Sequence, residues 1–178
     1  IADITEDVDM ILLVGSNPEE AHPVIGAQIR QAIQRGTQVV VVDPRKINLV
    51  KDSALHLQVQ AGTNVAFANG MMHVILKEGL ADRHFIEERT EGFSDLEKMV
   101  ADYTPEKVAE ICHIHPEDLI QAARMYAKAE KAPIIYCLGV TEHSTGTEGV
   151  MSMSNLAMLV GKVGKPGCGV NPLRGQNN

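Results

Sequence analysis

Residues that could do chemistry gather in a few short turns of this sequence. The turns all follow runs of apolar residues and cover residues 15–20, 43–46, 62–64 and 139–146. Glycines in them allow a ligand to approach the backbone, and N–H groups at the starts of helices attract phosphate. Arg45 and Lys46 add positive charge. These features outline a nucleotide-binding site, although the sequence contains neither a G-x-G-x-x-G nor a P-loop pattern.

The same residues also have ordinary structural interpretations. Asn17 and Asp43 are typical turn formers whose side chains bond their own backbone, and Asp43 could equally accept a ligand hydroxyl at the end of a strand. Arg45 fits either a solvated surface cation or a phosphate ligand. Glu142 and His143 could form an acid–base pair, but their polar loop favours exposure. Since no nucleophile–base pair or close carboxylate pair stands out, the residues alone favour a binding module.

Composition and charge argue against several classes of protein. The 178 residues carry a net charge of -7 at pH 7, which argues against a nucleic-acid partner. Cys112, Cys137 and Cys168 are far apart and form no C-x-x-C motif, so no disulfide framework and no metal site is expected, and reduced thiols favour a cytoplasmic location. We expect no membrane segment, because no apolar run is long enough to span a bilayer. The first residue is Ile1 rather than Met, which suggests a fragment of a larger protein.

Alternating strands and helices must position the turns. Continuous apolar runs predict buried strands over residues 10–14, 38–42, 56–59 and 133–138. Helical periodicity predicts helices over residues 24–35, 47–51, 64–77, 116–130 and 150–161, with others starting near Ser94 and Pro105. The pattern indicates one α/β domain over residues 1–178, Rossmann-like and three-layered, with a mostly parallel sheet and a helical insertion between the third and fourth strands. Residues 139–149 are expected to form a loop, and residues 165–178 an irregular tail.

In a parallel sheet, the turns that follow the strands meet at one edge. Ligands of such sheets bind just outside the carboxyl ends of the strands. We therefore expect the turns after all four predicted strands to form one groove, with residues 15–22 as its first ligand contact.

Several runs together, by their order and spacing, resemble the molybdopterin oxidoreductase family. They are VGSNPEEAHP, VVVVDPRK, RTEGF, ARMYAKA, GVTEHSTGTE and NLAMLVGKVGKPGCGVNPLRGQNN. The closing GVNPLRGQNN is most similar to formate dehydrogenases of that family. The resemblance covers essentially the whole sequence. It implies an α/β domain that grips a bis(molybdopterin guanine dinucleotide) cofactor carrying molybdenum or tungsten.

The resemblance also implies roles for individual residues. Cofactor-binding positions would be Gly15, Asn17, Glu20, Val42, Asp43, Arg45, Gly62, Asn64, Leu138, Gly139, Glu142 and Gln176. The family more often has Gln where Glu142 stands. Arg174 would face the metal and hold the carboxylate substrate, a task that suits a rigid guanidinium with paired donors.

The activity that the resemblance implies is oxidation of formate to carbon dioxide, with electrons passed through molybdenum to an iron–sulfur cluster. The metal ligand and the cluster cysteines would lie before Ile1, and domains after Asn178 would hold the second dinucleotide. The partners would then be formate, the remaining domains and electron-transfer subunits, and the isolated chain should be inactive. Two alternatives stay open: a domain of a family member that reduces nitrate or an S- or N-oxide, and a stand-alone nucleotide-binding module.

Overall fold

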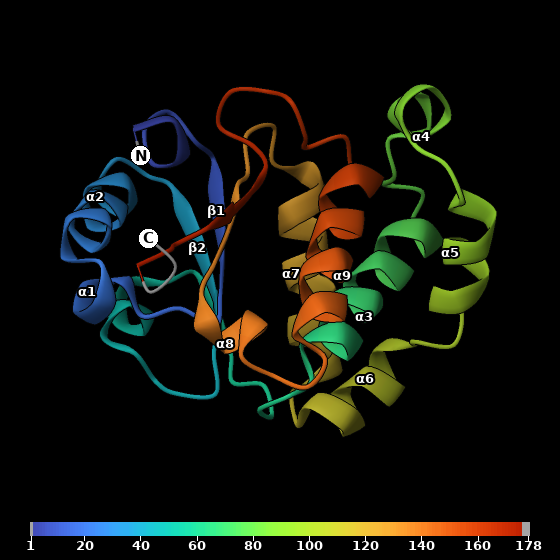
Figure 1. Cartoon of the computed structure of the whole chain (residues 1–178), viewed down its shortest axis with the longest axis horizontal. Helices are drawn as coiled ribbons and strands as arrows, with labels where there is room; N and C mark the ends of the chain where they lie inside the picture. Colours follow the sequence, from blue (N-terminus) through green and yellow to red (C-terminus); the bar gives the residue numbers. More distant parts are fainter. Residues whose placement is uncertain (1, 176–178) are drawn as a thin grey trace.

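The computed structural model describes residues 2–175, and a parallel five-stranded sheet runs through its centre (Figure 1). The strands are β1 (Met10–Val14), β2 (Gln38–Val42), β3 (Leu55–Leu57), β4 (Ile134–Tyr136) and β5 (Val170–Pro172). They lie in the order β3-β2-β1-β4-β5, and each neighbouring pair is parallel. Parallel neighbours need long crossover connections, which cover both faces of the sheet with helices.

The helices form a layer on each face of the sheet. One face carries α1 (Pro18–Ala21), α2 (Pro23–Gln34) and the 3-10 turns Ala2–Ile4 and Asn48–Asp52. On the other face, α7 (Pro116–Lys128) and α9 (Gly146–Leu159) contact the strands, and α3 (Asn64–Lys77) packs on both. The outer helices on that side are α4 (Arg83–Arg89), α5 (Phe93–Val100) and α6 (Pro105–Cys112), while α8 (Leu138–Thr141) follows β4. The predicted α/β fold is confirmed, with its helical insertion between β3 and β4.

Strand β1 is apolar at every position and does not alternate between apolar and polar residues. Met10, Leu12 and Val14 belong to the hydrophobic cluster shared with α3, α7 and α9, whereas Ile11 and Leu13 belong to the cluster shared with α2. Every residue of the strand is buried. A strand covered on both faces gains from apolar side chains at each position, so the alternation seen in half-exposed strands is absent.

Helix α3 is the centre of the larger cluster. Its buried residues include Phe67, Met71 and Met72, and it has apolar side chains nearly all round. His73 is also buried, and its Nδ1 lies 3.0 Å from the Val100 carbonyl oxygen, which satisfies the ring within the core. No helix among residues 2–175 is long and apolar enough to cross a bilayer.

The prediction of an irregular tail over residues 165–178 is wrong for residues 170–172, which form strand β5. Val170 pairs with Ile134 of β4, and the Ile134 amide donates to the Gly169 carbonyl at 2.9 Å. The glycines, proline and asparagine of this region indicate a loop by composition. Pairing with a strand more than thirty residues earlier overrides that local preference.

The prediction of a loop over residues 139–149 is wrong for residues 139–141, which belong to α8, and for residues 146–149, which begin α9; residues 142–145 between the helices are non-helical, as predicted. The glycines serve close packing here. A Cβ atom on Gly146 would lie 2.1 Å from the Thr141 carbonyl oxygen, and one on Gly149 would lie 3.2 Å from the Val140 side chain. Glycine therefore marks tight contact between α8 and α9 rather than an open loop.

Candidate functional site

A groove of about 330 Å³ lies at the carboxyl ends of the strands. Its lining comes from the segments that follow β1, β2, β3 and β4. The chain passes from β1 outward to β2 and β3, and then returns to the other side of β1 to form β4 and β5. The groove thus lies where the strand order reverses, which is the usual ligand position in open α/β sheets.

Two glycines from different strands meet in this groove. The Gly139 amide donates to the Gly15 carbonyl at 3.1 Å. A Cβ atom on Gly15 would lie 2.6 Å from the Gly139 carbonyl carbon, and one on Gly139 would lie 2.7 Å from the Gly15 Cα. Gly15 also has a φ of +54°, which disfavours other residues. The turns after β1 and β4 can touch only because both positions are glycine.

The Gly139 carbonyl is fixed by two side chains, one from the start of α3 and one from the loop between α8 and α9. Asn64, the buried first residue of α3, donates its Nδ2 hydrogen to this oxygen at 3.0 Å. His143 Nε2 lies 3.1 Å from the same oxygen. These contacts connect the start of α3 to the turn after β4. The Asn64 amide nitrogen therefore already donates to a protein acceptor, the Gly139 carbonyl oxygen, rather than to a ligand.

Asp43 and Arg45 form the turn after β2. Asp43 is 4% exposed, and its Oδ1 accepts the Arg45 amide at 2.8 Å, as expected for a turn former. His56 Nε2 lies 3.0 Å from the Asp43 carbonyl oxygen. The Arg45 side chain is 68% exposed, and its Nε lies 3.9 Å from Asp43 Oδ1. Its guanidinium is therefore loosely held and available to an anion in the groove.

The turn after β1 contains polar atoms with no partner among the described residues. Ser16 Oγ and Asn17 Oδ1 are both buried, yet neither makes a hydrogen bond there. An unsatisfied buried polar atom costs about 1–3 kcal/mol. Both residues line the groove, so a bound ligand could satisfy them.

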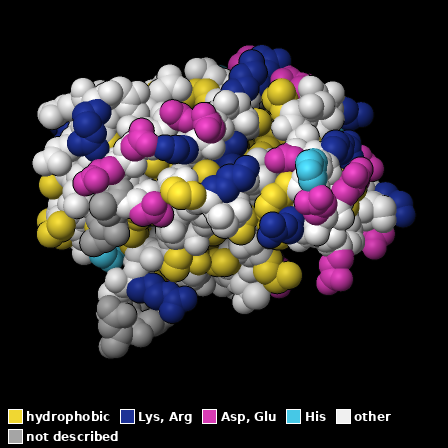
Figure 2. Space-filling model, turned by 90° about the horizontal axis from the view of Figure 1, so that it is seen from above, with side chains coloured by type: hydrophobic (Ala, Val, Ile, Leu, Met, Phe, Trp, Pro, Cys, Tyr) yellow, Lys and Arg dark blue, Asp and Glu magenta, His cyan; other side chains and the backbone are white. Residues whose placement is uncertain are grey.

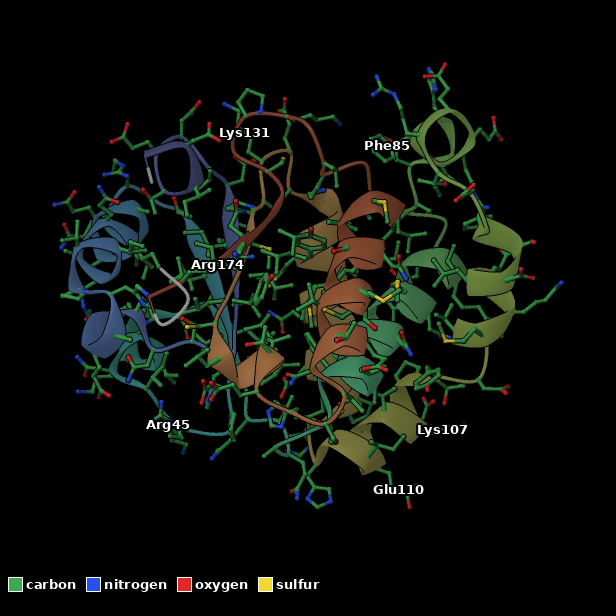
Figure 3. All side chains as sticks on the ribbon, viewed as in Figure 1. Arg45, Phe85, Lys107, Glu110, Lys131 and Arg174 are labelled. Atoms are coloured by element: carbon green, nitrogen blue, oxygen red, sulfur yellow. The ribbon has the colours of Figure 1, made fainter. Side chains whose placement is uncertain are left out.

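Arg174 lies beside a second hollow of about 110 Å³. This hollow and the groove share Cys137 and Leu138 in their linings. Burial raises the pKa of Tyr136, and the positive charge of Arg174 opposes this rise. Figure 3 shows Arg174 on the C-terminal segment that crosses the sheet, and Arg45 at the lower edge, where the strands end. The two guanidiniums thus lie at two neighbouring depressions that have Cys137 and Leu138 between them.

Most of the predicted site residues come together in the groove. Its lining includes Gly15, Asn17, Glu20, Val42, Asp43, Arg45, Gly62, Asn64, Leu138 and Gly139. Glu142 is exposed directly after α8 and is not among the residues that line the groove, whereas His143 is; the predicted contact of Glu142 with the cofactor stays a prediction. Gln176 lies outside the described residues.

Sequence reasoning missed the lining residues Gln60, Ala61 and Cys137, while Ser16 and His143 fell inside the predicted turns 15–20 and 139–146 without being named as cofactor-binding residues. Ser16 and Cys137 adjoin predicted positions, so their place after a strand was an available signal. Gln60 and Ala61 precede the Gly62 turn and carry no comparable signal.

A larger hollow of about 870 Å³ lies at the opposite edge, beside Asp9, Gln38 and α7. Asp9 precedes β1 and Gln38 begins β2, so this is the amino-terminal edge of the sheet. Figure 2 views the molecule from that side and shows acidic and basic side chains interspersed. We place the functional site in the smaller groove, because the strand ends, the touching glycines and the unsatisfied polar atoms all lie there.

Within residues 2–175, no three His, Cys, Asp or Glu side chains are grouped so as to hold a metal ion. Cys112, Cys137 and Cys168 are free thiols.

Comparison with known proteins identifies the family. Residues 1–178 match the family described as Molybdopterin oxidoreductase. The chain belongs to this family. It is 48% identical over 173 residues to the F420-dependent formate dehydrogenase subunit alpha of Methanocaldococcus jannaschii, covering 97% of this chain and 26% of that protein. It is 43% identical to formate dehydrogenase H of Escherichia coli, covering 97% and 24%.

Other members of the family are also similar. A nitrate reductase of Symbiobacterium thermophilum is 36% identical, over 98% of this chain and 24% of that protein. The structure of acetylene hydratase from Pelobacter acetylenicus matches with a TM-score of 0.84 and 28% identity, over 88% of this chain and 22% of that one. The chain spans about a quarter of the length of its curated relatives. The predicted family is confirmed.

Proposed function

We propose that this chain is the part of a formate dehydrogenase catalytic subunit that holds one guanine dinucleotide of a bis(molybdopterin guanine dinucleotide) cofactor. Similarity supports formate as the substrate, since the identity is 48% and 43% to formate dehydrogenases and 36% to a nitrate reductase. The observation that carries the cofactor assignment is the pair of buried, unsatisfied atoms in the groove, Ser16 Oγ and Asn17 Oδ1.

The residues of the groove fit a guanine dinucleotide. Asn17 Oδ1 can accept a hydrogen bond from a base or a ribose hydroxyl, and Ser16 Oγ can donate or accept one. A Cβ atom on Gly62 would meet no atom within 4 Å, so the backbone there lies open to a ligand. The exposed guanidinium of Arg45 can neutralise a diphosphate, because guanidinium groups form paired hydrogen bonds with phosphate.

Arg174 would act at the other end of the cofactor. Its guanidinium can orient a planar carboxylate by paired hydrogen bonds, and its fixed charge would offset the charge of formate. Because the hollow beside Arg174 is next to the groove, with Cys137 and Leu138 lining both, one extended cofactor that passes over these two residues would reach both arginines. When bound, the cofactor supplies a molybdenum or tungsten centre that takes two electrons from the substrate, which are then passed to an iron–sulfur cluster elsewhere in the protein.

The test uses the full-length enzyme, loaded with metal and cofactor. We expect it to reduce a viologen dye in the presence of formate, and to release guanine nucleotide on acid hydrolysis. Ser16→Ala with Asn17→Ala should lower the guanine nucleotide released per protein. Nitrate-dependent oxidation of the reduced dye, without formate oxidation, would favour a nitrate reductase instead. A wild-type nucleotide content in the double variant would show that the groove does not bind the cofactor.

A further inference from the structure

His22 connects the first turn of the groove to the segment that carries Arg174. It lies between α1 and α2, and its Nε2 is 3.3 Å from the Arg174 carbonyl oxygen, although 152 positions separate the two residues. A Cβ atom on Gly175 would lie 3.8 Å from the same nitrogen, so the imidazole is next to this peptide. Figure 1 shows the C-terminal segment crossing the sheet toward α1 and α2.

The other contacts of this segment act one residue earlier. The Leu173 amide donates to the Tyr136 carbonyl at 2.8 Å, and the Cys137 thiol donates to the Leu173 carbonyl at 3.1 Å. Both fix the position of Leu173 against β4. The Leu173 carbonyl belongs to the peptide before Arg174, whereas the His22 contact acts on the carbonyl of the peptide after it, so the Arg174 backbone is held from both sides.

The contact indicates which nitrogen of the imidazole carries a hydrogen. A carbonyl oxygen only accepts, so Nε2 must carry the hydrogen and donate it. Nδ1 is buried and has no partner among the described residues. A hydrogen on Nδ1 would be a buried donor without an acceptor, which is costly. The structure therefore places a hydrogen on Nε2, which donates it to the Arg174 carbonyl oxygen.

We propose that His22 is a positioning residue for Arg174. It ties the Arg174 peptide to the first turn of the cofactor groove, so that the guanidinium and the cofactor keep a fixed relative position. The inference rests on the proposed role of Arg174 in holding formate. Since a displacement of about 1 Å at a reacting group can cost about 100-fold in rate, one hydrogen bond to the arginine backbone can matter for substrate binding.

The test compares variants of the full-length enzyme. His22→Ala should raise the KM for formate about tenfold with a smaller change in kcat, because a misplaced arginine weakens binding of the anion. It should weaken binding of azide, a non-reacting anion, to a similar extent by calorimetry. His22→Gln keeps a donor near the position of Nε2 and should restore most of both values. Guanine nucleotide content should stay at the wild-type level in all these variants.

Two further variants separate positioning from folding. His22→Phe keeps a ring of similar size without a donor, so it should behave like His22→Ala, and it decides the question if His22→Ala does not fold. Val24→Ala changes a 66% exposed residue two positions away and should match the wild type.

The outcomes distinguish this inference from the proposed function. A wild-type enzyme that does not oxidise formate counts against the proposed function. An enzyme that oxidises formate, but whose KM and azide affinity are unchanged in His22→Ala and His22→Phe, overturns the role of His22. Loss of nucleotide content in parallel with the rise in KM also overturns it, because His22 would then support the groove as a whole.

Discussion

The backbones of Gly15 and Gly139 are in direct contact, with the Gly139 amide donating to the Gly15 carbonyl at 3.1 Å. These residues follow β1 and β4, the two strands between which the strand order reverses. The contact holds the turns of both strands at one point, and the groove is built around it.

Gly139→Ala should lower the free energy of unfolding by about 1–3 kcal/mol, the usual cost of forcing an extra methyl group into a packed site. Gly15→Ala should cost about 1 kcal/mol more, because its φ of +54° also disfavours a side chain. Gly36→Ala is the matched control: its φ is +107°, but a Cβ atom there would meet nothing within 4 Å. Urea unfolding checks all three, and equal losses for Gly15 and Gly36 would contradict a role for the contact.

Asn64→Ala should cost about 1–3 kcal/mol of stability, because it removes a donor from the Gly139 carbonyl. His143→Ala removes the other side-chain contact to the same oxygen. We expect the double variant to lose more than the two single losses added together, since the first substitution leaves one contact and the second leaves none. Unfolding free energies of all four proteins measure this coupling, and strict additivity would show that the contacts are independent.

Arg45→Ala should weaken retention of the guanine dinucleotide about tenfold or more, because a hydrogen bond to a charged group contributes about 1.5–3 kcal/mol. Lys51→Ala removes the same charge from an exposed position outside the groove and should leave retention unchanged. The difference between the two variants should shrink as salt is added, because Arg45 is largely exposed. Nucleotide release from the full-length enzyme during dialysis is the measurement; equal release from both variants would exclude a specific contact by Arg45.

Arg174→Lys should raise the KM for formate by about tenfold or more, although it keeps the charge, because an ammonium group cannot make the paired hydrogen bonds of a guanidinium. Lys165→Ala, at an exposed position on the same segment, should leave the KM unchanged. Steady-state kinetics of the full-length enzyme provide the measurement. A KM in Arg174→Lys equal to that of the wild type would mean that charge alone binds the substrate.

Lys162 should make stability increase with pH in the alkaline range. It is 4% exposed, its Nζ donates to the Ala127 carbonyl at 3.2 Å and lies 5.3 Å from the centre of the Tyr126 ring, and burial lowers its pKa. A lysine whose folded pKa is lowered binds fewer protons in the folded state than in the unfolded state. The charged form therefore costs stability at neutral pH, and this cost is relieved as the pH rises through the lowered pKa toward the ordinary value of 10.5.

Lys162→Met should abolish that rise, and Lys128→Met, at an exposed position, should retain it. Free energies of unfolding measured from neutral pH to about 10.5 test this. An equal alkaline rise in both variants would assign it to other groups.

Local sequence was sufficient to predict the two central strands, β1 and β2. Residues 10–14 and 38–42 were predicted as strands with their observed bounds, because each is a short, continuous apolar run followed by turn residues, and the second is also rich in β-branched valine. The turn residues Asn17, Arg45 and Asn64 were expected at one edge, and the structure brings them together there. In a parallel sheet, the turns that follow the strands all lie at the same edge, however far apart they are in the sequence.

The remaining features depend on pairs of residues far apart in the chain. Strand β5 exists because of its pairing with β4, and Gly146 is helical because of close packing on Thr141. The place of His143 in the groove goes with its contact to the Gly139 carbonyl oxygen, across the short helix α8, which composition did not predict.

By itself, the sequence determined the α/β class, the family and the edge of the sheet at which the ligand-binding turns meet, because these follow from local patterning and from the order of motifs along the chain. Only the tertiary structure decided that Gly15 touches Gly139, that Ser16 and Asn17 have unsatisfied atoms, and that His22 contacts the Arg174 peptide. Each of these depends on how distant segments pack or on which polar atoms remain unpaired after packing. Side-chain type and spacing do not encode such distances, which arise from the whole set of contacts formed on folding.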